Sequence, residues 1–400
     1  MLRWQFLCTS AILLLLPLAS CEREKETTAQ PEQEGPDILL VTLDTTRADR
    51  IGAYGYGPAE TPRLDSLASE GVLFEQAITP TAFTLPSHSS IMTGLYPPFH
   101  GVRLNGGAAL ADVQVTLAEQ LHSAGYRCGA VIGAFVVDQR WGLSQGFDFY
   151  DDDFEMGPDQ KLDLAGVQRP ADQVVDLGIE WLDADDGRPF FAWLHFYDPH
   201  KPYEPPEPYA SRFGGRGNSG LYDGEIAYTD FQIGRLFDWL DERGLAENTV
   251  VVVVGDHGES LGDHGEKEHG YYVYDATVRV PLIVKVPGTG LADLRVPAEV
   301  RTIDVLPTVL ELAGVPEAPT AQGRSLLPLI DGKMDRRPQP IPLVSGQAVR
   351  LIDNDDILQK GRLFRFDKDE KKDVDITDEN PGVFERLTAW EDTWRETVKK

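Results

Sequence analysis

Apolar runs of strand length alternate with segments of helical periodicity along the chain from Asp37 onward. Five of these runs have the length and composition of buried strands: Ile38 to Leu43, Cys128 to Ile132, Phe190 to Tyr197, Thr249 to Val254 and Leu282 to Val286. Amphipathic helices are predicted between them, from Pro62 to just before Gly71, from Val115 to Ala124 and from Tyr222 to Arg243. The alternation predicts an α/β fold, a mostly parallel sheet sandwiched by helices. The charge-rich stretch 345–400 predicts a small C-terminal appendage.

Polar residues with metal-binding or proton-transfer chemistry follow three of the predicted strands. Asp44 ends the first strand, Asp198 and His200 follow the Phe190 strand, and Asp256 and His257 follow the valine-rich strand. In open α/β sheets, ligands bind at the carboxyl ends of the strands. We therefore expect these side chains to meet at one edge of the sheet.

The N-terminal segment has the pattern of a secretory signal, with Arg3 ahead of an apolar run that reaches Leu18. This run is too short to span a bilayer. It ends in Leu18-Ala19-Ser20-Cys21, which resembles the bacterial lipobox, and the resemblance implies cleavage before Cys21 and acylation of that residue. An ordinary signal peptide with an incidental cysteine is the alternative. We expect a signal peptide over 1–20, a flexible tether over 21–35, and a protein lipid-anchored in the bacterial cell envelope, in the periplasm or at the cell surface.

Composition and charge narrow the possible partners. The chain is 42% hydrophobic and carries a formal net charge of -28, which describes a folded protein whose surface repels nucleic acid. We expect no nucleic-acid partner. If the substrate is anionic, the site needs a local source of positive charge, and a bound cation supplies one.

Two segments carry the candidate chemistry. Asp256 and His257 stand in a glycine-rich loop and offer an oxygen and a nitrogen to a divalent metal, with Asp44 as a further ligand; a surface turn is the alternative. In the other segment, Pro86 suits the start of a helix and places Thr84 at the helix N-terminus, where backbone N–H groups attract an anion. A hydroxyl there that touches a metal becomes a nucleophile, whereas the simpler interpretation of Thr84 is a helix cap.

Four segments in order resemble the signature of sulfatases and their phosphatase relatives in the alkaline phosphatase superfamily: Ile38 to Asp49, Thr84 to Gly94, Asp198 to Tyr203 and Gly255 to Gly270. The resemblance implies a sulfatase-like catalytic domain over 36–344 and a small subdomain over 345–400. It implies one divalent metal ion, held by Asp44, Asp256, His257 and Thr84, with Ca²⁺, Mn²⁺, Mg²⁺ and Zn²⁺ all open. It also implies that Thr84 is the nucleophile that cleaves a small anionic ester.

The same resemblance assigns roles to five further residues. It places His200 and His269 near the transferred group, where either protonates or orients the leaving alcohol. His88, Lys201 and Arg47 are the implied substrate-binding residues. Arg47 also supports the first loop, and a solvated lysine is the alternative for Lys201.

The chain departs from the sulfatase pattern at the nucleophile. Sulfatases carry Cys-x-Pro-x-Arg, or its serine form, and oxidise the first residue to formylglycine, whereas this chain has Thr84 and His88 at those places. Asp44-Thr45 replaces the usual aspartate pair, which weakens the case for a calcium cage. We therefore expect the protein to hydrolyse either a sulfate or a phosphate ester. The alternative functions are those of a phosphodiesterase or phosphotransferase of the same superfamily, or of a non-catalytic relic that binds anions.

Overall fold

The computed structural model describes residues 35–154, 166–316, 320–335, 340–345, 348–353, 356–359, 362–367 and 372–399. The expected signal peptide, Cys21 and the tether up to residue 34 lie outside the described residues. Among the helices that are described, none is long and apolar enough to cross a membrane.

A central sheet of nine strands dominates the described part of the chain. The strands run in the order β4 (Phe149–Asp151), β3 (Arg127–Ile132), β5 (Phe190–Phe196), β1 (Asp37–Leu43), β6 (Thr249–Gly255), β8 (Leu282–Lys285), β2 (Val72–Ile78) and β7 (Arg279–Val280), and β9 (Leu294–Arg301) pairs with β2. From β4 to β6 all neighbours are parallel, and β8 is antiparallel to both β6 and β2. The predicted α/β fold with a mostly parallel sheet is confirmed.

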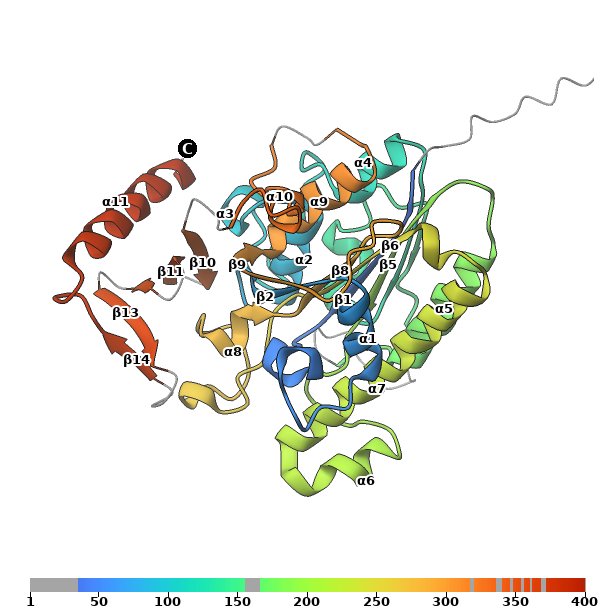
Figure 1. Ribbon diagram of the computed structural model, residues 1–400, viewed down its shortest axis with the longest axis horizontal. Coiled ribbons are helices and arrows are strands. Elements are labelled where there is room, and N and C mark those ends of the chain that lie inside the picture. The colour runs from blue at the N-terminus through green and yellow to red at the C-terminus, as the bar shows by residue number, and fades with distance from the viewer. Residues whose placement is uncertain are drawn as a thin grey trace, which may run out of the picture. The chain divides into compact units, whose positions relative to one another are not determined.

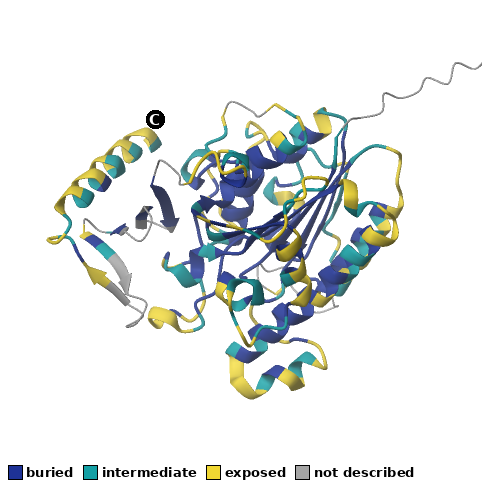
Figure 2. Cartoon of the chain, viewed as in Figure 1, coloured by how far each residue is buried: buried dark blue, intermediate teal, exposed yellow. Residues whose placement is uncertain are grey.

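Helices cover both faces of this sheet (Figure 1). In β1, Ile38 and Leu40 belong to one apolar cluster and Leu39 and Val41 to another, so both faces of the strand are buried (Figure 2). The first cluster includes residues of α2 (Thr84–Thr93), α4 (Leu117–Ser123), α9 (Val305–Leu312) and α10 (Leu327–Ile330). The second includes residues of α1 (Pro62–Glu70), α5 (Ala171–Asp183) and α7 (Gly217–Glu242). Burial on both faces explains why these strands read as continuous apolar runs.

The parallel register brings three strand ends to one edge. Leu43 pairs with Phe196 of β5 on one side and with Gly255 of β6 on the other. The next residues continue the alignment, because Asp44 N–H donates to the Phe196 carbonyl (2.9 Å) and Asp256 N–H donates to the Leu43 carbonyl (3.2 Å). The carboxyl ends of β5, β1 and β6 therefore present their loops side by side.

A second sheet and a helix form the C-terminal part. The antiparallel strands β10 (Ile341–Ser345), β11 (Ala348–Asp353), β12 (Asp356–Gln359), β13 (Arg362–Asp367) and β14 (Lys372–Asp375) pair in chain order, and α11 (Pro381–Val398) follows. Ile341 and Leu343 pack against Val273 and Val278, and Val344 N–H donates to the Pro80 carbonyl (2.7 Å). This is the expected small appendage, and its first strand begins at Ile341, ahead of the expected boundary at 345. The short helices α3 (Pro97–His100), α6 (Tyr209–Phe213) and α8 (Asp275–Val278) lie in connections of the larger part.

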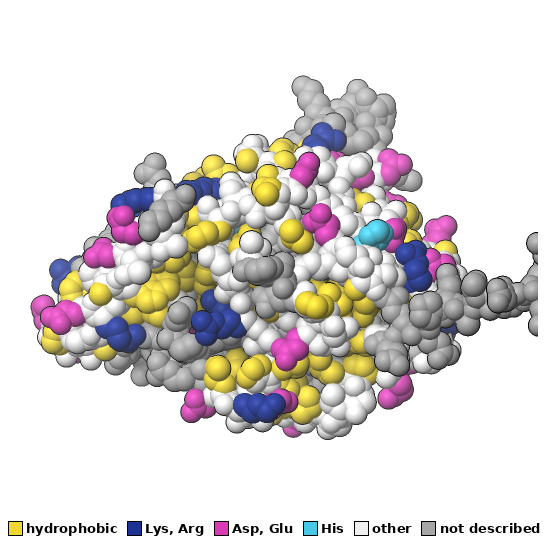
Figure 3. Space-filling view, turned by 90° about the horizontal axis from the view of Figure 1, so that it is seen from above, with side chains coloured by type: hydrophobic (Ala, Val, Ile, Leu, Met, Phe, Trp, Pro, Cys, Tyr) yellow, Lys and Arg dark blue, Asp and Glu magenta, His cyan; other side chains and the backbone are white. Residues whose placement is uncertain are grey.

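Many basic side chains on the surface form ion pairs with acidic side chains. Arg63 pairs with Asp238 (2.8 Å), and Arg243 pairs with Asp183 (2.6 Å). On the face shown in Figure 3, basic side chains lie in separate small groups among acidic and apolar ones. The formal net charge of -28 therefore gives a negative field around the molecule.

Candidate active site

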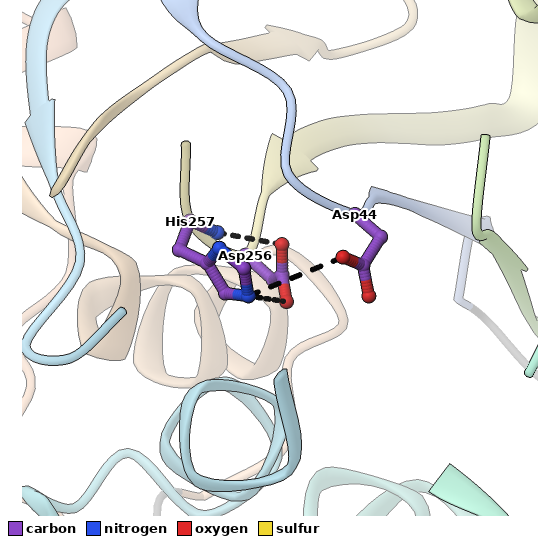
Figure 4. A group of neighbouring side chains, drawn as sticks. All are labelled: Asp44, Asp256 and His257. Atoms are coloured by element: carbon purple, nitrogen blue, oxygen red, sulfur yellow. Dashed lines mark hydrogen bonds and ion pairs between the residues drawn. The ribbon is translucent and has the colours of Figure 1, made fainter. Parts of the chain in front are cut away.

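Asp44, Asp256 and His257 converge at the shared edge of β1 and β6 (Figure 4). All three side chains are fully buried, and one ligand atom from each lies within 4.8 Å of the others. This is the only such group of three or more histidine, cysteine or acidic side chains among the described residues. The arrangement agrees with the ligand set expected from the sequence.

The atoms of this group that face one another are all hydrogen-bond acceptors. His257 Nδ1 lies 3.0 Å from the Gly258 carbonyl, so Nδ1 carries the proton and Nε2 is left as an acceptor. His257 Nε2 faces Asp256 Oδ2 (3.4 Å) and Asp44 Oδ1 (4.0 Å), and neither of these oxygens accepts a hydrogen bond from the described residues. Buried acceptors without donors are costly unless a cation binds them. The donor set therefore fits a divalent metal ion.

Burial sets the protonation tendencies of these ligands. It raises the pKa of both Asp44 and Asp256, and the charge of Asp44 raises that of Asp256 further. Burial also lowers the pKa of His257, which keeps the imidazole neutral. Two Asp256 contacts oppose the rise, because Thr45 N–H (3.1 Å) and His257 N–H (2.6 Å) both donate to Oδ1. Oδ1 is thus held by the backbone, and Oδ2 is the oxygen available to a cation.

Thr84 is the first residue of α2, and its Oγ1 lies 3.2 Å from His257 Nε2. The hydroxyl therefore stands beside the proposed metal ligands, as expected. Fewer backbone N–H groups at the start of α2 are free to bind an anion than the sequence predicted. Leu85 N–H donates to Asn105 Oδ1 (2.9 Å), Pro86 has no N–H, and Ser87 N–H donates to the Phe83 carbonyl (2.9 Å).

His269 and His200 lie beside the metal ligands. The His269 ring is 4.4 Å from the His257 ring and 5.3 Å from the His200 ring. His269 Nδ1 contacts Glu259 Oε1 (3.3 Å), and Glu259 Oε2 accepts the Tyr203 hydroxyl (2.9 Å). Burial alone lowers the pKa of His269, but the Glu259 carboxylate outweighs burial and raises it. His200 Nδ1 instead lies 2.8 Å from the Lys201 carbonyl, and burial lowers the pKa of His200.

Two of the three expected substrate-binding residues, His88 and Arg47, have close partners within the protein. His88 is fully buried; its Nδ1 lies 2.8 Å from the Thr84 carbonyl and its Nε2 lies 3.0 Å from Thr42 Oγ1, so neither ring nitrogen is free for a substrate. Arg47 binds Asp49 (2.7 Å) and Asp263 (2.5 Å), which joins the first loop to the loop after β6. The supporting role expected for Arg47 fits this geometry better than substrate binding does.

Lys201 remains a surface lysine in the structure. Its side chain is 51% exposed and forms an ion pair with Glu268. Substrate binding by Lys201 stays a prediction, and the alternative of a solvated lysine agrees with its exposure.

The sequence interpretation missed three residues of the site. His195 lies inside β5 and its Nε2 is 3.4 Å from Asp44 Oδ2, Glu259 anchors His269, and Asn105 holds the first turn of α2. The signal for His195 was a lone histidine in the apolar run Phe190–Phe196, at a position that pairs with Thr42 of β1. A lone histidine in an apolar strand is more often a core residue, so the sequence pattern alone did not mark His195 as part of the site.

Comparisons with known proteins show the family of the chain. Residues 36–315 match the family model described as Sulfatase. The ulvan-active sulfatase of Formosa agariphila is 29% identical over 82% of this chain and 72% of that protein. An arylsulfatase of Clostridium perfringens is 27% identical over 74% of this chain and 78% of its own. The solved phosphonate monoester hydrolase of Agrobacterium radiobacter superposes with a TM-score of 0.75 at 20% identity, over 91% of this chain and 96% of that chain.

The family model covers most of the chain and spans every residue of the site from Asp44 to His269. The relatives are named as sulfatases, and the chain covers more than two thirds of each. The chain therefore belongs to the sulfatase family of the alkaline phosphatase superfamily and is an ester hydrolase.

Proposed function

We propose that this chain hydrolyses a small sulfate or phosphate ester with the unmodified Thr84 hydroxyl as nucleophile and one divalent cation held by Asp44, Asp256 and His257. The observation that carries the proposal is the position of Thr84 Oγ1, 3.2 Å from His257 Nε2 and beside two carboxylates with an unpaired oxygen each. A divalent cation in this site lowers the pKa of the hydroxyl and offsets charge on the transferred group.

In the proposed reaction, Thr84 Oγ1 attacks the sulfur or phosphorus atom in line with the leaving alcohol. The new ester bond to Thr84 forms as the bond to the alcohol oxygen breaks. A proton from a histidine goes to that oxygen, and His269 is better placed than His200 because Glu259 fixes its Nδ1. The proton that Thr84 Oγ1 carried before the attack goes to solvent. In the second half, the histidine that gave up its proton takes one from the attacking water, the bond from sulfur or phosphorus to Thr84 Oγ1 breaks as the anion leaves, and Oγ1 regains a proton from solvent.

A threonine nucleophile favours phosphorus over sulfur. A formylglycine hydrate expels its anion by reforming an aldehyde, whereas an ester on Thr84 must be opened by water at the central atom. Phosphodiesterase or phosphotransferase activity is the second candidate, because the same threonine suits it. A non-catalytic relic is disfavoured, since a binding module needs no hydroxyl aligned with the three candidate ligands.

A screen of the full-length protein tests the proposal. Aryl sulfate, aryl phosphate and aryl phosphodiester are each supplied with Mg²⁺, Mn²⁺, Ca²⁺ or Zn²⁺ after chelation of bound metal. We expect metal-dependent hydrolysis that is fastest for one of the phosphorus esters. Hydrolysis that ignores chelation, or none with any ester and metal, contradicts the proposed function, and a sulfate preference contradicts the argument from threonine.

We also propose that the protein is exported and lipid-anchored in the bacterial cell envelope through Cys21, which rests on the sequence Leu18-Ala19-Ser20-Cys21. Replacing Cys21→Ser should leave uncleaved precursor or release the protein from the membrane fraction. Cys8→Ser is the matched control, because Cys8 lies inside the apolar run and should not affect processing. Unchanged membrane association and lipid labelling of the Cys21 variant would reject the anchor.

A further inference from the structure

Two fully buried histidines pack edge to face beside the site, with ring centroids 4.7 Å apart. His195 comes from β5 and His88 from α2, and neither has a role in the steps described above. Each ring has a hydrogen-bond partner at both nitrogens, so each tautomer can be assigned from the chemistry of its partners.

His195 carries its proton on Nε2. Its Nδ1 accepts the Gly133 backbone N–H (3.2 Å), and an amide can only donate. The remaining Nε2–H lies 3.4 Å from Asp44 Oδ2 and donates to it. Oδ2 is thereby occupied, and Oδ1 is the Asp44 oxygen that stays unpaired and lies 4.0 Å from His257 Nε2.

His88 carries its proton on the opposite nitrogen. Trp193 Nε1–H donates to Thr42 Oγ1 (2.9 Å), so the Thr42 hydroxyl proton is free to donate to His88 Nε2 (3.0 Å). His88 Nδ1–H then donates to the backbone carbonyl of Thr84 (2.8 Å). This bond fixes the backbone of the nucleophile from within the first turn of α2.

We propose that His195 and His88 are positioning residues of opposite tautomer: His195 turns Asp44 Oδ1 toward the metal, and His88 holds Thr84 in place for attack. The role of His195 predicts an effect on metal affinity. The role of His88 rests on the proposed function, in which Thr84 is the nucleophile. Outer contacts of this kind are worth about 10- to 100-fold in metal affinity or activity.

Asparagine and glutamine substitutions can distinguish the roles of the two ring nitrogens of a histidine, because each amide replaces only one of them. The glutamine amide can place an N–H group near the Nε2 position, and the asparagine amide reaches only the Nδ1 position. His195→Gln should therefore keep the affinity for Mn²⁺ within about threefold, and His195→Asn should weaken it about 10- to 100-fold, as titrated on the full-length protein. Equal affinities for the two variants, or a larger loss for glutamine, would overturn the role of His195.

His88 should give the reverse order. His88→Asn keeps a donor for the Thr84 carbonyl and should retain most of kcat, whereas His88→Gln should lose about 10-fold or more in kcat with KM unchanged. Both variants are assayed at saturating Mn²⁺, because His88 Nδ1 also lies 3.6 Å from Asp256 Oδ2. The ester is the one that the wild-type protein hydrolyses fastest in the screen. Equal losses, or the order seen for His195, overturn the role of His88. A wild-type protein inactive on every ester rejects the proposed function and the His88 role with it, and leaves the His195 result standing.

Histidine ¹⁵N NMR of the labelled protein tests both tautomers without turnover. We expect a protonated Nδ1 for His88 and a protonated Nε2 for His195, with the peaks assigned from the His88→Asn and His195→Gln variants. The opposite tautomer at either histidine overturns the proposal for that residue.

Discussion

Asp256 shows how the two oxygens of one buried carboxylate can differ, with one bound by the backbone and the other left for the proposed cation. Its Oδ1 accepts two backbone N–H groups and its Oδ2 accepts none from the described residues. Burial raises the pKa of Asp256, and the charge of the close Asp44 carboxylate raises it further, so a second negative charge at this place is unfavourable. Folding therefore leaves an electrostatic strain that binding of a divalent cation relieves.

Asp256→Asn should remove most of the bound metal and most of the hydrolysis together. The amide keeps the shape and can still accept the two N–H groups, but it supplies a weaker ligand and no negative charge. We expect about a 100-fold or larger loss of metal affinity, measured by titration with elemental analysis. Asp241→Asn, which changes an exposed carboxylate on α7, is the control. Full metal stoichiometry in Asp256→Asn would exclude it as a ligand.

The positions of the candidate metal ligands and of Thr84 could be predicted from the sequence because these residues follow strands or start a helix, where local pattern and position coincide. The roles of His88 and His195 could not. His88 was interpreted as a substrate ligand because it replaces an arginine of the family pattern, and only the contact with Thr42 shows that its ring is fully used. His195 depends on a partner 151 positions away in the chain.

At the scale of elements, α7 buries Glu225 without an ion pair to a basic side chain among the described residues. Glu225 Oε1 accepts the Glu204 N–H (2.6 Å), and its Oε2 accepts nothing from the described residues. Burial, with the charges of Asp198 and Glu204, raises the pKa of Glu225 to about 9. Burial likewise raises the pKa of Asp198 to about 7. Glu225 therefore holds the backbone of Glu204, in the segment that follows His200, with a carboxyl group whose raised pKa favours the protonated form at neutral pH.

Glu225→Gln should make stability less dependent on pH. The folded-state pKa lies above the unfolded value of about 4.3, so the stabilising contribution is complete below pH 4 and is lost as pH rises toward 9. The wild-type melting temperature should therefore fall between pH 5 and pH 9, by calorimetry, and the variant should fall less and melt roughly 2 °C or more higher at pH 9. Glu242→Gln, at the exposed end of α7, is the control. Parallel curves for all three proteins would show that Glu225 is charged in the folded state.

Four strands of the central sheet, β2, β4, β7 and β9, escaped sequence analysis, and for β2 and β9 the reasons are local. β2 has polar Glu75 and Gln76 in its middle and follows α1 after a single glycine. β9 contains Pro297, and the β2–β9 register shifts between Phe74 and Gln76. Proline and polar interruptions weaken a strand pattern, and only pairing between distant segments makes these strands part of the sheet.

At the scale of the whole molecule, the negative field opposes the approach of the substrate class that the site is proposed to bind. The formal net charge is -28, and many basic side chains are already paired with acids. A screened Coulomb repulsion acts on association at low ionic strength and fades when the Debye length falls to about 8 Å at 0.15 M salt.

Added salt should therefore speed the reaction at low substrate concentration. For an anionic ester, kcat/KM should rise about twofold or more between 10 and 150 mM KCl, with little change in kcat, because screening affects encounter and not the chemical step. Steady-state kinetics at fixed metal saturation measure this. A fall in kcat/KM with salt would mean that a local positive field dominates at the mouth of the site.

The central claim is that the Thr84 hydroxyl performs the attack, and turnover by Thr84→Ala tests it most directly when metal content is measured in the same samples. Thr93→Ala is the matched control, because it removes a buried threonine hydroxyl from the other end of α2. We predict that Thr84→Ala keeps its metal and loses about 1,000-fold or more in kcat, while Thr93→Ala stays active. Near-normal hydrolysis by metal-loaded Thr84→Ala would contradict the account and point to direct attack by water.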